Sequence, residues 1–180
     1  MKKRTLDIQN LCMIGVMTAV ICIMAQISIP MPLGVPMTMQ TFAIALAGII
    51  LGSKNSSIAT LIYVLIGSVG VPVFSNFTGG YERLISPTGG FILSFPIMAY
   101  LIGLGVEYQS KFKGALLLGL IIGNAINLLC GTVMFCFISE TDFVAGLTAC
   151  VLPFLPVTVI KMWLAWTVGL RIKRHLFYSR

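Results

Sequence analysis

The stretch FVAGLTACVLPFLPVTVIKMWLAWTVGL, residues 143–170, is long enough to cross a bilayer and contains one charged side chain, Lys161. An ammonium group in hydrocarbon is costly unless it has a partner. All the acidic residues lie at segment ends or in loops: Asp7, Glu82, Glu107, Glu140 and Asp142. We therefore expect a bound anion to supply the counter-charge. The alternatives are that Lys161 snorkels to the interface, or that it caps backbone carbonyls freed by Pro153 and Pro156.

The composition is that of an integral membrane protein. Hydrophobic residues make up 58% of the 180 residues and charged residues 9%, whereas a soluble domain carries about 25% charged residues. The net charge is +7, but the basic residues cluster at the ends of apolar runs. That distribution indicates membrane topology and argues against nucleic-acid binding. We expect a single membrane domain over residues 1–180, in contact with lipid.

Breaks at glycines, prolines and charge clusters divide the chain into six candidate membrane helices. Their approximate ranges are 10–27, 38–51, 56–70, 89–105, 114–139 and 143–170. The basic residues other than Arg83 and Lys161 then fall on one side of the membrane. The positive-inside rule places that side, with both termini, in the cytoplasm. The basic cluster Lys2-Lys3-Arg4 precedes the first apolar run, which we expect to be a retained helix rather than a cleaved signal.

The outer segments predict a ligand pocket. Residues 71–90 combine aromatic side chains, polar groups and paired glycines, which suit a site for a small molecule. An interfacial loop with belt aromatics is the alternative. The start of the fourth helix, Thr88-Gly89-Gly90, offers free N–H groups that favour negative charge. The candidate contacts are Gln40, Phe74, Asn76, Tyr81, Arg83, Thr88, Gly89, Gly90, Phe91, Asn127, Thr158 and Lys161.

Two asparagines in the fifth run, Asn124 and Asn127, lie one turn apart and offer donors and acceptors. Hydrogen bonding between helices is an equally good role for them. In the first run, Gly15 and Ala19 form a small-x-x-x-small pattern. This pattern permits close helix packing, either inside the protein or against a partner protein.

Catalysis, cofactors and metals are not expected. The five cysteines lie in apolar runs without a C-x-x-C pair, and the single histidine, His175, lies in the basic tail. A membrane enzyme would need a nucleophile–base pair or metal ligands facing one cavity. The sequence also lacks the pattern G-x-x-x-x-G-K-[ST], so we expect no ATP-driven pump in this chain alone.

Several segments together resemble the BioY family. They are Ala25-Gln-Ile-Ser-Ile-Pro30, Pro36-Met-Thr-Met-Gln-Thr-Phe-Ala43, Leu46-Ala-Gly-Ile-Ile-Leu-Gly52, Gly70-Val-Pro-Val-Phe74 and Ser86-Pro-Thr-Gly-Gly-Phe91. Members of that family are the biotin-binding S components of energy-coupling factor (ECF) transporters. The resemblance implies a six-helix S-component fold in a prokaryotic plasma membrane. It also implies biotin as substrate, and as partners a transmembrane coupling protein and two ATPases.

The chain departs from the family pattern near Lys161. The sixth helix of the family usually reads Pro-Gly-Asp-x-x-Lys, and here Thr158 stands at the acidic position of Pro156-Val-Thr-Val-Ile-Lys161. Threonine cannot balance an ammonium group, so Lys161 depends more on a ligand carboxylate, or on Glu82. The alternative substrates are lipoate or a biotin precursor. A membrane protein that only binds partner helices is a further alternative.

Overall fold

The computed structural model describes residues 8–31 and 35–178. The basic cluster Lys2-Lys3-Arg4, residues 32–34 of the Pro-rich outer segment and Arg180 lie outside these residues. The elements in chain order are α1 (Ile8–Ala25), β1 (Ser28–Ile29), β2 (Met37–Thr38), α2 (Gln40–Ser68), η1 (Ser75–Phe77), η2 (Tyr81–Arg83), α3 (Gly89–Glu107), α4 (Ala115–Ser139), α5 (Phe143–Cys150) and α6 (Leu155–Tyr178).

The described chain is almost entirely helical. Four of its helices are long and apolar enough to cross a membrane: α1, α3, α4 and α6 over Leu155–Leu176. Their outward faces carry large apolar side chains such as Leu118, Phe137 and Trp163. Such faces suit lipid contact, as a multi-pass membrane protein requires. Strands β1 and β2 form a short antiparallel hairpin after α1.

Helix α2 is a helical hairpin rather than one rod. Gly52, with φ 77° and ψ −177°, interrupts its helical geometry. The side chain of Gln40 donates to the hydroxyl of Tyr63, yet 23 residues of straight helix would separate these positions by about 35 Å. The two halves therefore fold back beside each other. They correspond to the helices expected at 38–51 and 56–70, but a single residue joins them where the sequence suggested a short loop.

The corner at Gly52 is fixed by the end of α3. The carboxylate of Glu107 accepts hydrogen bonds from the Ser53 backbone N–H at 2.8 Å and from its hydroxyl at 2.9 Å. A Cβ atom at position 52 would lie 2.8 Å from that carboxylate, and the backbone there adopts a conformation almost restricted to glycine. Glycine is therefore required by both the turn and its cap.

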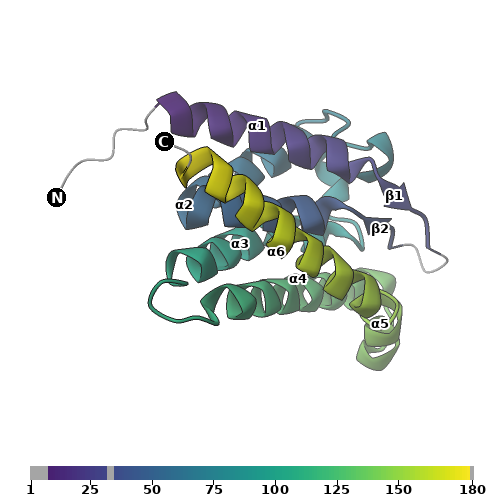
Figure 1. The fold of residues 1–180 in the computed structure, drawn as a ribbon. Helices are drawn as coiled ribbons and strands as arrows, with labels where there is room; N and C mark the ends of the chain where they lie inside the picture. The colour runs from purple at the N-terminus through teal and green to yellow at the C-terminus, as the bar shows by residue number, and fades with distance from the viewer. Residues whose placement is uncertain (1–7, 32–34, 179–180) are drawn as a thin grey trace.

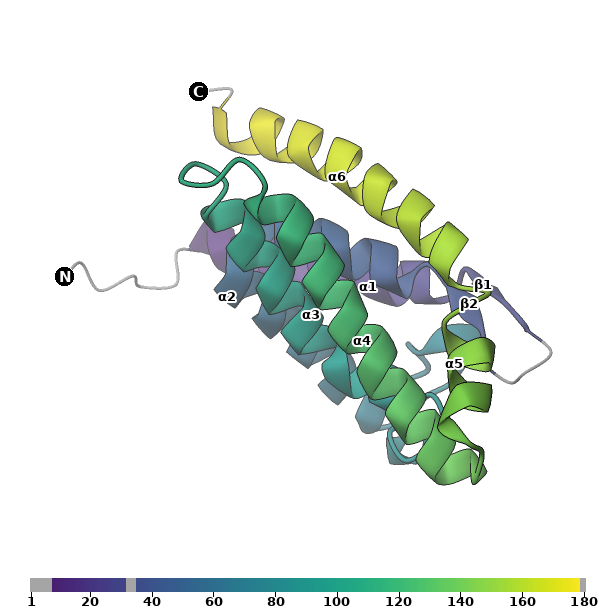
Figure 2. The same cartoon turned by 90° about the horizontal axis from the view of Figure 1, so that it is seen from below.

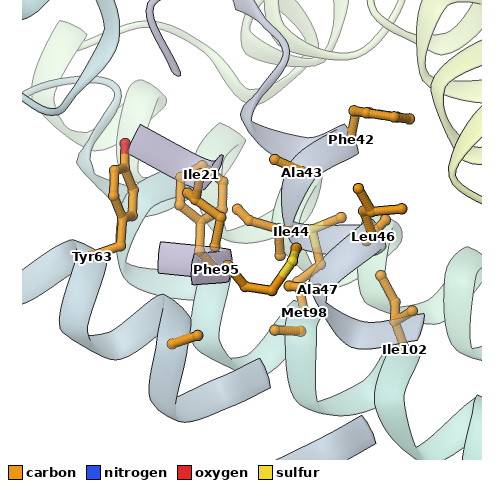
Figure 3. Close-up of a cluster of buried hydrophobic side chains, with 14 of the residues drawn as sticks. Ile21, Phe42, Ala43, Ile44, Leu46, Ala47, Tyr63, Phe95, Met98 and Ile102 are labelled. Atoms are coloured by element: carbon orange, nitrogen blue, oxygen red, sulfur yellow. The ribbon is translucent and has the colours of Figure 1, made fainter. Parts of the chain in front are cut away.

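The core lies between α1, α2 and α3. Helix α2 packs against α1, α3 and α6, while α4 packs against α3 and α5. Small side chains from the first half of α2 bring the helices close together, and larger ones from α1 and α3 fill the spaces, as Figure 3 shows for Ile21, Ala43, Ala47, Phe95 and Met98. Helix α1 begins and α6 ends at the same end of the bundle, and the hairpin and α5 lie at the other (Figures 1 and 2).

The prediction of one helix over residues 143–170 is wrong. The chain forms the short helix α5, then turns through residues 151–154, and α6 begins at Leu155 and continues to Tyr178. Pro153 has no N–H to donate and disfavours helical geometry at the preceding residue, so the helix breaks there. The side chain of Asp142 caps α5 by accepting from the Val144 N–H. The uninterrupted apolar run concealed this break.

Candidate ligand-binding cavity

An internal cavity lies where the hairpin and the first turns of α2, α3 and α6 meet the middle of α4. Its volume is about 70 Å³. The lining combines apolar walls with a few polar groups: Val35, Pro36, Thr38, Gln40, Thr41, Ser75, Thr88, Phe91, Ile92, Phe95, Asn124, Asn127, Leu128, Phe154, Thr158 and Lys161. We call it the inner cavity. It therefore brings together six of the twelve candidate contacts, namely Gln40, Thr88, Phe91, Asn127, Thr158 and Lys161, and Asn124 as well.

A second cavity, of about 190 Å³, adjoins it under the outer loop. The two share Pro36, Ser75, Thr88 and Ile92. This outer cavity adds three further predicted contacts to the lining, Phe74, Asn76 and Arg83. The two cavities are therefore neighbours, with the outer one nearer the outer loops and the inner one lined by Lys161.

Lys161 is buried, with 6% of its surface exposed. Its ammonium nitrogen donates to the Thr38 carbonyl oxygen at 2.6 Å. The lysine therefore does not snorkel, and the carbonyl that it caps belongs to β2 rather than to its own helix. An ammonium group has three N–H donors, so two remain for a ligand. Glu82 does not supply the counter-charge, because it is exposed and does not line either cavity.

Hydrogen bonds extend from Lys161 across the base of the cavity. The Thr38 hydroxyl donates to the Gln40 Oε1 at 2.8 Å, and the Gln40 amide donates to the Tyr63 hydroxyl. The ring of Tyr63 meets Phe74 edge to face, with centroids 5.5 Å apart. This chain of contacts joins α6, β2, α2 and the outer loop. Gln40 therefore contributes by fixing the cavity wall, with both ends of its amide already bonded.

Asn124 and Asn127 form the polar part of the α4 wall. The Asn127 amide nitrogen donates to the Phe91 carbonyl at 3.0 Å and to the Ser94 hydroxyl at 2.8 Å. The Asn124 amide nitrogen donates to the Leu120 carbonyl at 3.0 Å. Asn127 thus joins α3 to α4, as the interhelical alternative predicted. Both carbonyl oxygens are left as acceptors for ligand N–H groups.

Three predicted contacts lie outside the two cavities. Tyr81 is exposed on the surface. Gly89 and Gly90 are buried in helix packing, because a Cβ atom would collide with the Leu84 carbonyl at Gly89 and with the Cys130 carbonyl at Gly90. The Gly89 N–H already donates to the Ser86 carbonyl. The paired glycines therefore serve close approach of backbones within the protein.

Sequence reasoning missed much of the lining. Thr38 lies in the short strand β2, Ser75 begins the one-turn helix η1, and Phe154 lies in the break between α5 and α6. None of them has a periodic signal. The one available indication was a polar residue, Thr38, at the predicted start of the helix expected at 38–51.

Gly15 and Ala19 lie on the outer face of α1, opposite its buried residues Ile14, Thr18 and Ile21. A Cβ atom at Gly15 would have no atom within 4 Å. Packing within the described chain therefore does not use this small-residue pair.

Comparison with known proteins agrees with this architecture. A family model described as the BioY family matches residues 1–177. The chain is 34% identical to the biotin transporter BioY2 of Lactococcus lactis subsp. cremoris over 172 residues, covering 94% of this chain and 93% of that protein. It is 36% identical to the biotin transporter BioY of Thermotoga maritima over 160 residues, covering 89% and 93%.

The fold is also similar to a solved structure. A crystal structure of the S-component for biotin from an ECF-type ABC transporter matches with a TM-score of 0.85 at 25% identity, covering 97% of this chain and 95% of that one. The family match extends over nearly the whole sequence, and the structural match extends over the same elements. The chain therefore belongs to the BioY family.

Proposed function

We propose that this protein is the substrate-binding subunit of a biotin uptake transporter of the ECF type. The observation that carries the proposal is the inner cavity, in which a buried lysine and two asparagines are set among apolar walls beneath the outer loops. Relatives that cover almost the whole chain are biotin transporters. A ligand-binding and delivery role, rather than catalysis, fits the chemistry of these groups.

The cavity lining complements the groups of biotin. A carboxylate beside Lys161 would receive the two remaining ammonium N–H groups in a charge-assisted contact. The ureido ring presents N–H donors to the carbonyl oxygens of Asn124 and Asn127. Phe91, Phe95 and the neighbouring apolar side chains would cover the hydrocarbon tail. This orientation puts the acid end toward α6 and the ring toward α4.

The size of the inner cavity implies movement on binding. Sites for small molecules usually enclose about 300–1,000 Å³, and the inner cavity encloses about 70 Å³. The outer cavity adjoins it, and the loop of residues 73–78 supplies four of the residues that line the outer cavity: Phe74, Ser75, Asn76 and Thr78. Biotin therefore requires displacement of this loop or of cavity side chains.

We further propose that residues 1–180 form one membrane domain with six membrane-crossing helices, the two halves of α2 counting as two. Basic residues lie beside the corner at Gly52 (Lys54), in the turn between α3 and α4 (Lys111 and Lys113) and in the last turns of α6 (Arg171). The α3–α4 turn and the end of α6 lie at the bundle end where α1 begins (Figure 1). The positive-inside rule makes that end cytoplasmic and the cavity end external. In a prokaryotic plasma membrane, biotin would then enter from outside.

Transport requires partners, which we propose are a transmembrane coupling protein and two ATPases. The small residues Gly15 and Ala19 face outward on α1 and permit close approach of another helix. Since no residue of α1 lines the inner or the outer cavity, docking there would leave both free to hold a ligand. ATP hydrolysis would then be the task of the partners.

The direct test is calorimetric titration of the purified protein with biotin and with biotin methyl ester. We expect one-to-one binding of biotin, with the ester weaker by about ten- to a hundredfold, because a hydrogen bond to a charged group contributes about 1.5–3 kcal/mol. Equal affinities would remove the anion-binding role of Lys161. Tight binding of lipoate without binding of biotin would assign the subunit to that other acid.

A further inference from the structure

Gln26 follows the last residue of α1 and connects this helix to the outer loop. Its amide nitrogen donates to the Cys22 carbonyl at 3.1 Å and to the Val73 carbonyl at 3.2 Å. Its carbonyl oxygen accepts from the Phe77 backbone N–H at 2.8 Å. One side chain therefore binds both ends of the segment 73–77, although Phe77 lies 51 residues after Gln26 in the sequence.

The segment that Gln26 holds has an unfavourable backbone conformation. Asn76 and Phe77 are consecutive residues in the left-handed region, with φ 58° and 54°. Asparagine tolerates this region, but phenylalanine adopts it rarely. The Phe77 side chain is 72% exposed, so its own packing does not explain the conformation. Strained backbone persists where surrounding contacts enforce it, and here the contact on the Phe77 N–H is Gln26.

The same segment forms part of the wall of the outer cavity. Ser75, Asn76 and Thr78 line it. On one side the segment is anchored by Phe74, which is 1% exposed and packs against Gly67 and the Tyr63 ring. On the other side it is anchored through hydrogen bonds to Gln26. Moving the buried Phe74 would disrupt the core, whereas the hydrogen bonds from Gln26 to Val73 and Phe77 lie nearer the surface and can break more easily.

We propose that Gln26 is a positioning residue that holds the segment 73–78 closed over the ligand path, and that biotin enters and leaves when its bonds to Val73 and Phe77 break. The proposal rests on the proposed function for the identity of the ligand. During opening, Phe74 stays packed, and the strained backbone at Phe77 relaxes. Gln26 therefore controls the rates of binding and release more than the fit of the bound ligand.

The chain offers a matched control at the other end of the bundle. The Gln109 amide donates to the Lys113 carbonyl at 3.1 Å and accepts from the Leu116 N–H at 2.8 Å. Gln109→Met therefore removes the same kinds of bond as Gln26→Met, in a turn that does not line the inner or outer cavity. Gln26→Glu keeps an acceptor for the Phe77 N–H and loses the donor to Val73.

The experiment measures two quantities on the full-length protein in lipid nanodiscs. The first is hydrogen exchange at the Phe77 amide without biotin, and the second is the biotin dissociation rate. We expect Gln26→Met to accelerate both by up to about tenfold, the value of one net hydrogen bond. Gln26→Glu should restore slow exchange at Phe77 in part, and Gln109→Met should leave both quantities unchanged.

Unchanged exchange at Phe77 in Gln26→Met would overturn the proposal, and so would faster exchange with an unchanged dissociation rate. An equal response in Gln109→Met would show a general loss of stability instead and would also overturn it. If Gln26→Met fails to fold, Gln26→Glu decides through the same two measurements. If the wild-type protein binds no biotin, the proposed function fails, while exchange at Phe77 still decides whether Gln26 positions the loop.

Discussion

The two ends of the helical bundle are built in different ways. At the end where α1 begins, the chain reverses at Gly52 through one residue and between α3 and α4 through a short turn. Glu107 caps the first reversal and Gln109 the second. At the other end, the connections are longer, contain the hairpin, η1, η2 and α5, and supply much of the cavity lining.

This difference suggests that one end of the bundle determines the stability of the protein and the other end its affinity for biotin. Tight turns with side-chain caps fix the helices at one end, and a change there should alter the free energy of unfolding without altering biotin affinity. The connections at the other end position polar groups around the two cavities. A change there should alter biotin affinity, with little effect on the free energy of unfolding. The variants below test this separation, starting with the largest expected effect.

Gly52→Ala should destabilise the protein most. The backbone conformation at position 52 is almost restricted to glycine, and the added methyl group must displace the Glu107 carboxylate from Ser53. We expect a loss of about 3 kcal/mol in the free energy of unfolding, measured by denaturant unfolding in detergent. Biotin affinity of the folded fraction should be unchanged.

Gly70→Ala is the control at the cavity end. Gly70 also has positive φ, at 111°, but a Cβ atom there would have no neighbour within 4 Å. Its loss of stability should be smaller because only backbone strain contributes. A loss as large as that of Gly52→Ala would show that the Glu107 cap adds nothing.

Lys161→Met should weaken biotin binding by about ten- to a hundredfold through loss of the charge-assisted contact. It also removes a costly buried charge, so the stability of the ligand-free protein should be kept or raised. Thermal unfolding with and without biotin measures both effects, since a bound ligand raises the unfolding temperature. Lys54→Met, at an exposed position of the opposite end, is the control. A full biotin-induced shift in Lys161→Met would contradict the role of Lys161.

Glu107→Gln should have a moderate effect. Glutamine keeps one oxygen to accept from Ser53, but the bonds are no longer charge-assisted. We expect a loss of about 1 kcal/mol in unfolding free energy, with biotin affinity unchanged. Reduced affinity at unchanged stability would contradict the separation of the two ends.

Gly15→Leu should leave both stability and biotin affinity of the isolated protein unchanged, because Gly15 faces outward between the two ends. The larger side chain should block close approach of the coupling protein. Co-purification with that protein and biotin uptake by cells would both be lost. Normal assembly and uptake in Gly15→Leu and Ala19→Leu would place the docking surface elsewhere.

The sequence predicted best where one residue type has few structural explanations. A charge within an apolar run identified Lys161, and glycine beside lysine identified the break near Gly52. Helices α3 and α4 lie within two residues of the expected ranges, because their polar flanks are clear. These signals are local and need no knowledge of packing.

The sequence was a poor guide to features that depend on contacts between residues distant in the chain. Gly89 and Gly90 permit close approach of either a ligand or another part of the backbone, and only the structure shows that the Leu84 carbonyl of the outer loop and the Cys130 carbonyl of α4 approach them. At Gln26 the sequence predicts only the end of a helix, because its partners Val73 and Phe77 are distant in sequence. Phe154 entered the cavity because the chain breaks before α6.

The single-residue reversal at Gly52 also limits which parts of the protein move relative to one another. Because a single non-helical residue joins them, the two halves of α2 cannot slide along each other unless helical turns unwind. The backbone of Ser53 lies against Gly103 of α3, so α3 is bound to the same corner. These segments therefore form one rigid body. Helices α1 and α6 pack mainly on α2. Residues 26–39 join α1 to α2, and residues 140–154, which include α5, join α4 to α6, so α1 and α6 are less constrained by their connections than the rigid body is.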